Sequence, residues 1–85
     1  MNTADNFTVT GYPLRCALVT KSDTVDLPNP GIVRADAAGA VTVIPYGNPD
    51  NTAFTFNLAA GEAVPCVVKR VKSTGTDSIT LHVMY

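Results

Sequence analysis

The sequence predicts a small all-β domain, a single-domain antiparallel β-sandwich or barrel of six to seven short strands. Short apolar or alternating segments recur at intervals of roughly 8–12 residues and are separated by clusters of Gly, Pro, Asn, Asp and Ser. No window carries the i, i+3, i+4, i+7 spacing of an amphipathic helix. Glu62 is the single glutamate, and strong helix formers are scarce beyond scattered alanines.

The N-terminus is predicted to be an arm that lies outside the core. Residues 1–6 are polar and close to the chain end, so they are expected to be flexible, and residues 7–85 are expected to form the single β-sandwich domain. Residues 7–10 (F-T-V-T) alternate, which fits either a short first strand or an extended arm.

Six further segments favour a pleated, half-buried surface because they are apolar or alternate with a period of two. They are residues 14–20, 32–35, 41–44, 54–58, 64–71 and 79–85. We interpret residues 14–20 (L-R-C-A-L-V-T) as a core strand. The last three segments organise the rest of the chain, with turns expected at residues 59–61 and 73–77.

The strand at residues 54–58 places Phe54, Phe56 and Leu58 on one face, which is expected to be core. If so, replacing either phenylalanine by alanine costs about 3–5 kcal/mol. The final strand has an equally regular apolar face, made by Ile79, Leu81, Val83 and Tyr85.

The alternation is imperfect at residues 67–71, where basic side chains interrupt the valines. Either a β-bulge near Lys69 and Arg70 or a strand that contacts protein on both sides would explain the pattern.

Three connections are rich in turn-forming residues. Residues 23–31 contain two prolines and a glycine, so they predict an ordered loop that Leu27 could anchor. Residues 36–39 are small enough for a tight turn. Residues 45–51 are the most turn-rich run and predict an exposed loop.

Composition excludes several classes of function. Six basic and seven acidic residues leave no electrostatic footprint for nucleic acid. No apolar run reaches the roughly 18 residues that a membrane-spanning helix needs. The N-terminal residues lack the basic start and apolar core of a signal peptide, which predicts synthesis and retention in the cytoplasm or transport from it inside an assembly.

The residues that could carry chemistry do not form a recognisable site. Cys16 and Cys66 could form a disulfide, but without an export signal we expect two buried, reduced thiols. No zinc-ligand spacing is present, and no cofactor is predicted. A Ser/His/Asp arrangement would need His82, which lies within a predicted strand, and no G-x-S-x-G turn is present. Asp23 and Asp26 could touch calcium, although turn-stabilising hydrogen bonds are the expected role.

The candidate functional residues are therefore candidates for contact with a partner protein. The basic trio Lys69, Arg70 and Lys72 fits either a solvated edge that discourages aggregation or a contact with an acidic partner. The remaining candidates lie in the arm and the two long loops: Phe7, Tyr12, Asp23, Asp26, Leu27, Tyr46 and Asn48.

Several short motifs, in this order, resemble a known family. They are S-D-T-V-D-L-P at residues 22–28, R-A at 34–35, A-G-A-V-T-V at 38–43, A-G-E-A-V-P at 60–65, K-R-V-K-S-T-G-T at 69–76, and a closing apolar strand that ends in Tyr85. Together they resemble the small spike base proteins on the heads of tailed bacteriophages and of the related gene transfer agents of alphaproteobacteria. Asp77 departs from the family's usual V-x-x-T-G-T-T ending, and the loop at residues 45–51 is longer and richer in proline than is typical.

The resemblance implies a non-enzymatic virion protein on the outer capsid surface, made in the host cytoplasm. It would serve as a head spike base or as a cement (decoration) protein. The implied partners are the major capsid protein, a spike fibre protein and further copies of the chain in a trimer or pentamer, with no nucleic acid and no membrane. Two other interpretations remain: a structural protein of the tail or baseplate, and a free-standing β-sandwich binding module. The latter usually displays exposed tryptophan or tyrosine side chains, and this chain has no tryptophan and three tyrosines.

Overall fold

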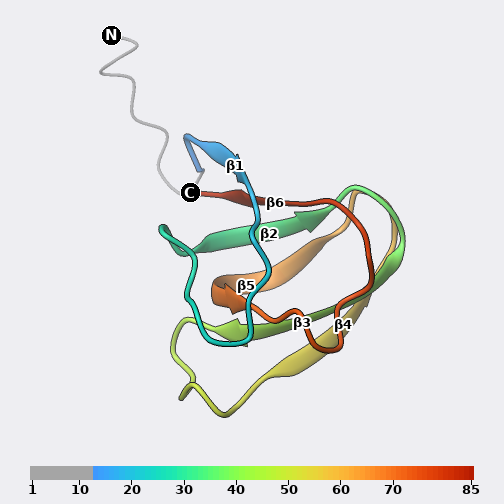
Figure 1. Ribbon diagram of the computed structural model, residues 1–85. Helices are drawn as coiled ribbons and strands as arrows, with labels where there is room; N and C mark the ends of the chain where they lie inside the picture. Colours follow the sequence, from blue (N-terminus) through green and yellow to red (C-terminus); the bar gives the residue numbers. More distant parts are fainter. Residues whose placement is uncertain (1–12) are drawn as a thin grey trace, which may run out of the picture.

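The described part of the computed structural model, residues 13–85, contains six strands joined by turns and loops (Figure 1). In chain order they are β1 (Cys16–Leu18), β2 (Gly31–Ala35), β3 (Gly39–Pro45), β4 (Phe54–Leu58), β5 (Ala63–Val71) and β6 (Leu81–Met84). The predicted small, all-β antiparallel class is therefore confirmed. The expected arm at residues 1–6 and the segment at residues 7–10 lie outside the described residues.

All six strands belong to one antiparallel sheet with the order β1-β6-β2-β5-β3-β4. Only β3 and β4 are neighbours both in sequence and in the sheet, because β5 inserts between β2 and β3. The turn at residues 36–38 therefore links two strands that are not paired with each other. β1 and β4 are the two edges of the sheet.

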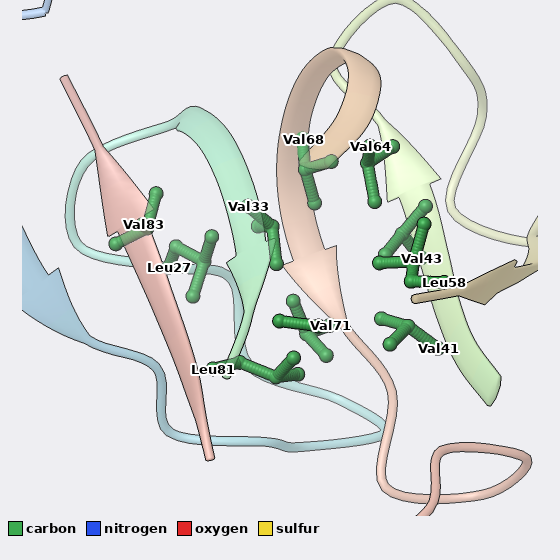
Figure 2. Close-up of a cluster of buried hydrophobic side chains, with 11 residues drawn as sticks. Leu27, Val33, Val41, Val43, Leu58, Val64, Val68, Val71, Leu81 and Val83 are labelled. Atoms are coloured by element: carbon green, nitrogen blue, oxygen red, sulfur yellow. The ribbon is translucent and has the colours of Figure 1, made fainter. Parts of the chain in front are cut away.

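The core is built mainly from valines that alternate along the central strands. Val33, Val41, Val43, Val64 and Val68 have no exposed surface, and Leu81 and Val83 of β6 join the same cluster. Figure 2 shows the side chain of Leu27 beside Val83 and Val33, although Leu27 belongs to the loop between β1 and β2.

A β-bulge interrupts β5, as one of the two explanations of its pattern predicted. Ile44 lies opposite Arg70 while the next residue, Pro45, lies opposite Val68, so Lys69 has no partner on β3. The extra residue resets the alternation, which lets Val68 and Val71 both point into the core.

The loop between β1 and β2 crosses the sheet (Figure 1) and takes the place of β2 beside the second half of β5. β2 begins opposite Val68, and beyond this point the loop supplies the hydrogen bonds. The Leu27 N–H donates to the Lys69 carbonyl at 2.7 Å, and the Ser22 N–H donates to the Val71 carbonyl at 2.9 Å. The predicted ordered loop thus extends the sheet.

The loop between β5 and β6 folds back along β3. The Asp77 N–H donates to the Ala40 carbonyl at 2.8 Å, and the Thr42 N–H donates to Thr76 Oγ1 at 2.9 Å. Gly75 has a φ of 87°, and its carbonyl accepts from the Thr42 hydroxyl at 3.0 Å. This close approach buries both faces of β3, which explains its unbroken buried run from Val41 to Ile44.

The expectation that both phenylalanines of β4 are core residues is wrong. Leu58 is buried, Phe56 is partly buried against the cluster, and Phe54 is 52% exposed. The three side chains share a face, but β4 is an edge strand, so the core covers that face at one end only.

The expectation of a core strand at residues 14–20 is also wrong. β1 has three residues and lies at the other edge, where Leu14 and Leu18 are 65% and 69% exposed. Cys16 is exposed and Cys66 is half-buried, and both thiols are free. The expectation that both thiols are buried is therefore wrong, because neither side chain is fully buried.

Candidate partner-binding surface

Arg70 connects the two long loops, residues 19–30 and 46–53, that the sequence analysis predicted to face a partner. Its side chain is 10% exposed, and Nε donates to Asp26 Oδ1 at 2.8 Å. Nη1 donates to the Asp23 carbonyl at 3.3 Å, and Nη2 lies 3.6 Å from Asp50 Oδ2. One guanidinium thus holds the loop of residues 19–30 and the loop of residues 46–53 on the same end of the sheet.

Lys69, the bulge residue, strengthens the same junction. Its Nζ lies 2.9 Å from Asp50 Oδ1. The hydrogen bond and the positive charge of Lys69, followed by the charge of Arg70, hold the pKa of Asp50 below its ordinary value. The acidic groups that face this part of the basic trio therefore belong to the same chain.

Asp23 fastens the loop of residues 19–30 to the loop between β5 and β6. Its Oδ1 accepts from the Thr74 N–H at 2.9 Å, and its Oδ2 accepts from the Thr74 hydroxyl at 2.7 Å. These hydrogen bonds, helped by the charge of Lys72, hold the pKa of Asp23 below its ordinary value. The Lys21 ammonium adds a hydrogen bond to the Asp77 carbonyl at 3.1 Å.

The structure separates the predicted contact residues into two kinds. Leu27 is 6% exposed and anchors its loop in the core, so its side chain is closed to a partner. Tyr46 is 63% exposed at the start of its loop, whereas Asn48 is half-buried and reaches the Thr52 carbonyl at 3.5 Å. Lys72 is half-buried. Phe7 and Tyr12 lie outside the described residues.

Val25 is an exposed apolar residue that the sequence analysis did not single out. It is 64% exposed and lines a shallow hollow of about 360 Å³ with Thr20, Lys21, Ser22, Asp26 and Pro28. Ser22 shapes this turn, because its hydroxyl accepts from the Val25 N–H at 3.0 Å. The sequence could have indicated that Val25 is exposed, because this valine follows the turn-forming run Ser-Asp-Thr. A side chain in such a turn is not part of a strand that packs against the core.

The structure places His82, which a Ser/His/Asp arrangement would need, beside Asp36. His82 Nδ1 lies 3.2 Å from Asp36 Oδ1, and the Arg34 guanidinium binds the same oxygen at 2.9 Å. Asp36 thus forms an ion pair with Arg34 and a contact with His82 at the surface. Residues 13–85 contain no group of three or more His, Cys, Asp or Glu side chains placed to hold a metal ion. They also contain no helix long and apolar enough to cross a membrane.

No protein-family model and no curated protein matches the chain. Among solved structures, its fold is similar to that of a chain from the "Capsid of native GTA particle computed with C5 symmetry", GTA being a gene transfer agent. The superposition has a TM-score of 0.79 and covers 100% of both chains at 23% sequence identity. The two chains share a fold.

Proposed function

We propose that the protein is a non-enzymatic structural component of a phage-type virion, attached to the outer capsid surface as a head spike base or a cement (decoration) protein. The observation that carries the proposal is the full-length likeness to a chain of the GTA capsid particle. Fold alone does not establish function. The order of the motifs quoted above points to the same class independently of the fold.

The arrangement of the loops supports a binding role. Arg70 holds the two long loops against β5, and Asp23 ties one of them to the loop between β5 and β6. A surface that includes Tyr46 and Val25 is therefore ordered before a partner arrives. Such preorganisation reduces the entropy that binding costs. A capsid presents many identical sites, so copies joined in a trimer or pentamer gain affinity through avidity.

Electron cryo-microscopy of purified particles from the source tests the proposal directly. We expect density of this size and shape to repeat on the outer surface of the head, in contact with the major capsid protein. Density beneath a fibre would assign the spike-base role, and density between capsid subunits would assign the cement role. If mass spectrometry finds the protein in the particles but the head lacks the density, the tail or baseplate interpretation replaces ours.

Co-sedimentation with purified shells tests which surface binds. Tyr46→Asp is expected to weaken binding at least tenfold, which corresponds to about 1.4 kcal/mol. Ala37→Asp is the matched control, because the turn at residues 36–38 and the loop at residues 46–53 lie at opposite ends of β3. Deletion of residues 1–6 is expected to weaken attachment and to leave the β-sheet circular dichroism unchanged. Equal binding by Tyr46→Asp and Ala37→Asp would place the contact elsewhere.

A further inference from the structure

In the part of the chain that the structure describes, neither edge strand carries the features that usually keep an edge from pairing with another strand. β4 (F-T-F-N-L) and β1 (C-A-L) contain no lysine and no proline, and the register between β3 and β4 runs without a bulge. Proteins normally block edge strands with such devices, because unpaired backbone groups recruit another strand. Within residues 13–85, each of these strands pairs on one side only.

The backbone groups that face outward can be assigned from the hydrogen bonds. On β3, Thr42 and Ala40 bond to the segment beyond β5, so the alternate residues face β4 and are paired with Phe54, Phe56 and Leu58. Thr55 and Asn57 therefore direct their N–H and C=O groups away from the sheet.

The same reasoning applies at β1. The Arg15 carbonyl accepts from the Tyr85 N–H, and the Val19 N–H donates to the Leu81 carbonyl, so residues 15, 17 and 19 face β6. Cys16 and Leu18 therefore direct their backbone groups outward. Each edge therefore offers two outward-facing residues that are separated by one inward-facing residue.

The apolar inner face also reaches both edges. Ala17 and Val19 at β1, and Phe56 at β4, are only partly buried where they pack against the core. Phe54 lies opposite the buried Val43 and is 52% exposed. A strand added at either edge would cover these side chains.

We propose that β1 of one copy pairs antiparallel with β4 of the next, so that the sheet continues from subunit to subunit. Because neighbouring strands alternate in direction across the six-stranded sheet, β1 and β4 run in opposite directions. A rotation about an axis parallel to the strands keeps these directions. The β1 strand of one copy can therefore lie antiparallel to β4 of the next copy. A contact between two different surfaces generates a ring when the rotation closes. The inference deepens the self-association suggested above, and it does not depend on capsid attachment.

One register satisfies all four outward-facing residues. Thr55 then pairs with Leu18, and Asn57 pairs with Cys16, of the neighbouring copy. In this register Phe56 lies opposite Ala17 and Phe54 opposite Val19, which joins the apolar inner faces of the two copies. Because β1 has three residues, each contact is short, and ring closure supplies the additional affinity.

Disulfide trapping tests this register with a native cysteine. In Asn57→Cys, the new thiol lies opposite Cys16 of the next copy, at the Cα spacing of about 5.5 Å that a disulfide accepts. Mild oxidation at protein concentrations where wild type self-associates is expected to yield a ladder of covalent oligomers. Peptide mass spectrometry should identify the 16–57 bond. Ala37→Cys, an exposed position in the turn between β2 and β3, and Asn57→Cys with Cys16→Ser are expected to give no ladder.

Sedimentation of a second pair of variants tests the edge without a new thiol. Asn57→Pro removes one outward N–H and leaves the β3–β4 hydrogen bonds intact, so it is expected to remain folded but to sediment as the 8.9 kDa monomer. Asn57→Thr keeps the N–H and should associate like wild type. The proposal is overturned if the wild-type protein is still a monomer at about millimolar concentration. It is also overturned if the protein forms a two-fold dimer through β4 and β4, in which the Asn57→Cys thiol does not reach Cys16. Both assays use isolated protein, so their failure leaves the shell-binding test unaffected.

Discussion

Replacing Arg70 by alanine is expected to lower the free energy of unfolding by about 2–3 kcal/mol. The guanidinium is 10% exposed and donates to Asp26 at 2.8 Å and to the Asp23 carbonyl at 3.3 Å. Hydrogen bonds to charged groups contribute about 1.5–3 kcal/mol each. Breaking a fully buried ion pair costs about 3–5 kcal/mol, a value not reached here because the Asp26 side chain is 50% exposed and regains water.

Urea denaturation measures this loss, with Lys69→Ala as the matched control. Lys69 also binds an aspartate at 2.9 Å, but its partner Asp50 is 68% exposed, and such surface pairs contribute about 0–1 kcal/mol. A double-mutant cycle of Arg70→Ala with Asp26→Ala should give a coupling of about 1 kcal/mol or more. If Arg70→Ala costs no more than Lys69→Ala, Arg70 is not the residue that holds the two loops.

Three other substitutions separate the effects of charge, backbone conformation and burial. Asp23→Asn should reduce the loss of stability in acid. The pKa of Asp23 lies below its ordinary value of 3.8, so its contribution to stability is complete above that pH and is lost as the pH falls through the folded-state pKa. Urea midpoints measured from neutral pH to about pH 2 will show the difference. Gly75→Ala should lower the stability measured by thermal unfolding by about 1–3 kcal/mol, because φ is +87° and a Cβ would lie 2.5 Å from the Thr42 hydroxyl of β3. Gly47→Ala is the control and should leave stability unchanged, since nothing lies within 4 Å of the added Cβ. In urea titrations of the dilute protein, Leu58→Ala should lower the free energy of unfolding by about 2–5 kcal/mol, because Leu58 is buried. Phe54→Ala should lower it by about 1 kcal/mol, because Phe54 is half exposed. Equal losses would contradict the edge position of β4.

Local patterns predicted the strands well because alternation and turn residues act over a few neighbours. The expected strand at residues 54–58 coincides with β4, and those at 32–35 and 41–44 lie within β2 and β3. The disturbed alternation around Lys69 also predicted the bulge. A period of two shows which side chains share a face, and an extra residue shifts that period.

The order of strands in the sheet could not be predicted from the same patterns. Phe54 and Leu18 have the composition of core residues, yet both lie in edge strands and are more than half exposed. Whether an apolar face is covered depends on which strands are neighbours, and that is decided by pairings between distant parts of the chain. The insertion of β5 between β2 and β3 is such a pairing.

The contacts of Arg70 were equally hidden from the sequence. Its partner Asp26 is 44 residues away, so the sequence suggested only a solvated edge or a contact with an acidic partner for the basic trio. The motifs that carry the family resemblance turn out to contact one another. Asp23 of the first motif binds Thr74 of the motif at residues 69–76, and Ala35 exchanges backbone hydrogen bonds with Gly61 and Glu62. These short motifs therefore specify how loops dock on the sheet.

This docking leaves the two proposed interaction surfaces separable. The loops that carry Tyr46 and Val25 are held by Arg70, which lies on β5 near the middle of the strand order, whereas the inferred self-association uses β1 and β4 at its ends. A change at Asn57 should therefore abolish the oligomer and leave the affinity of a single copy for the shell unchanged. The loss of avidity should then appear only on intact particles, where several copies can bind at once.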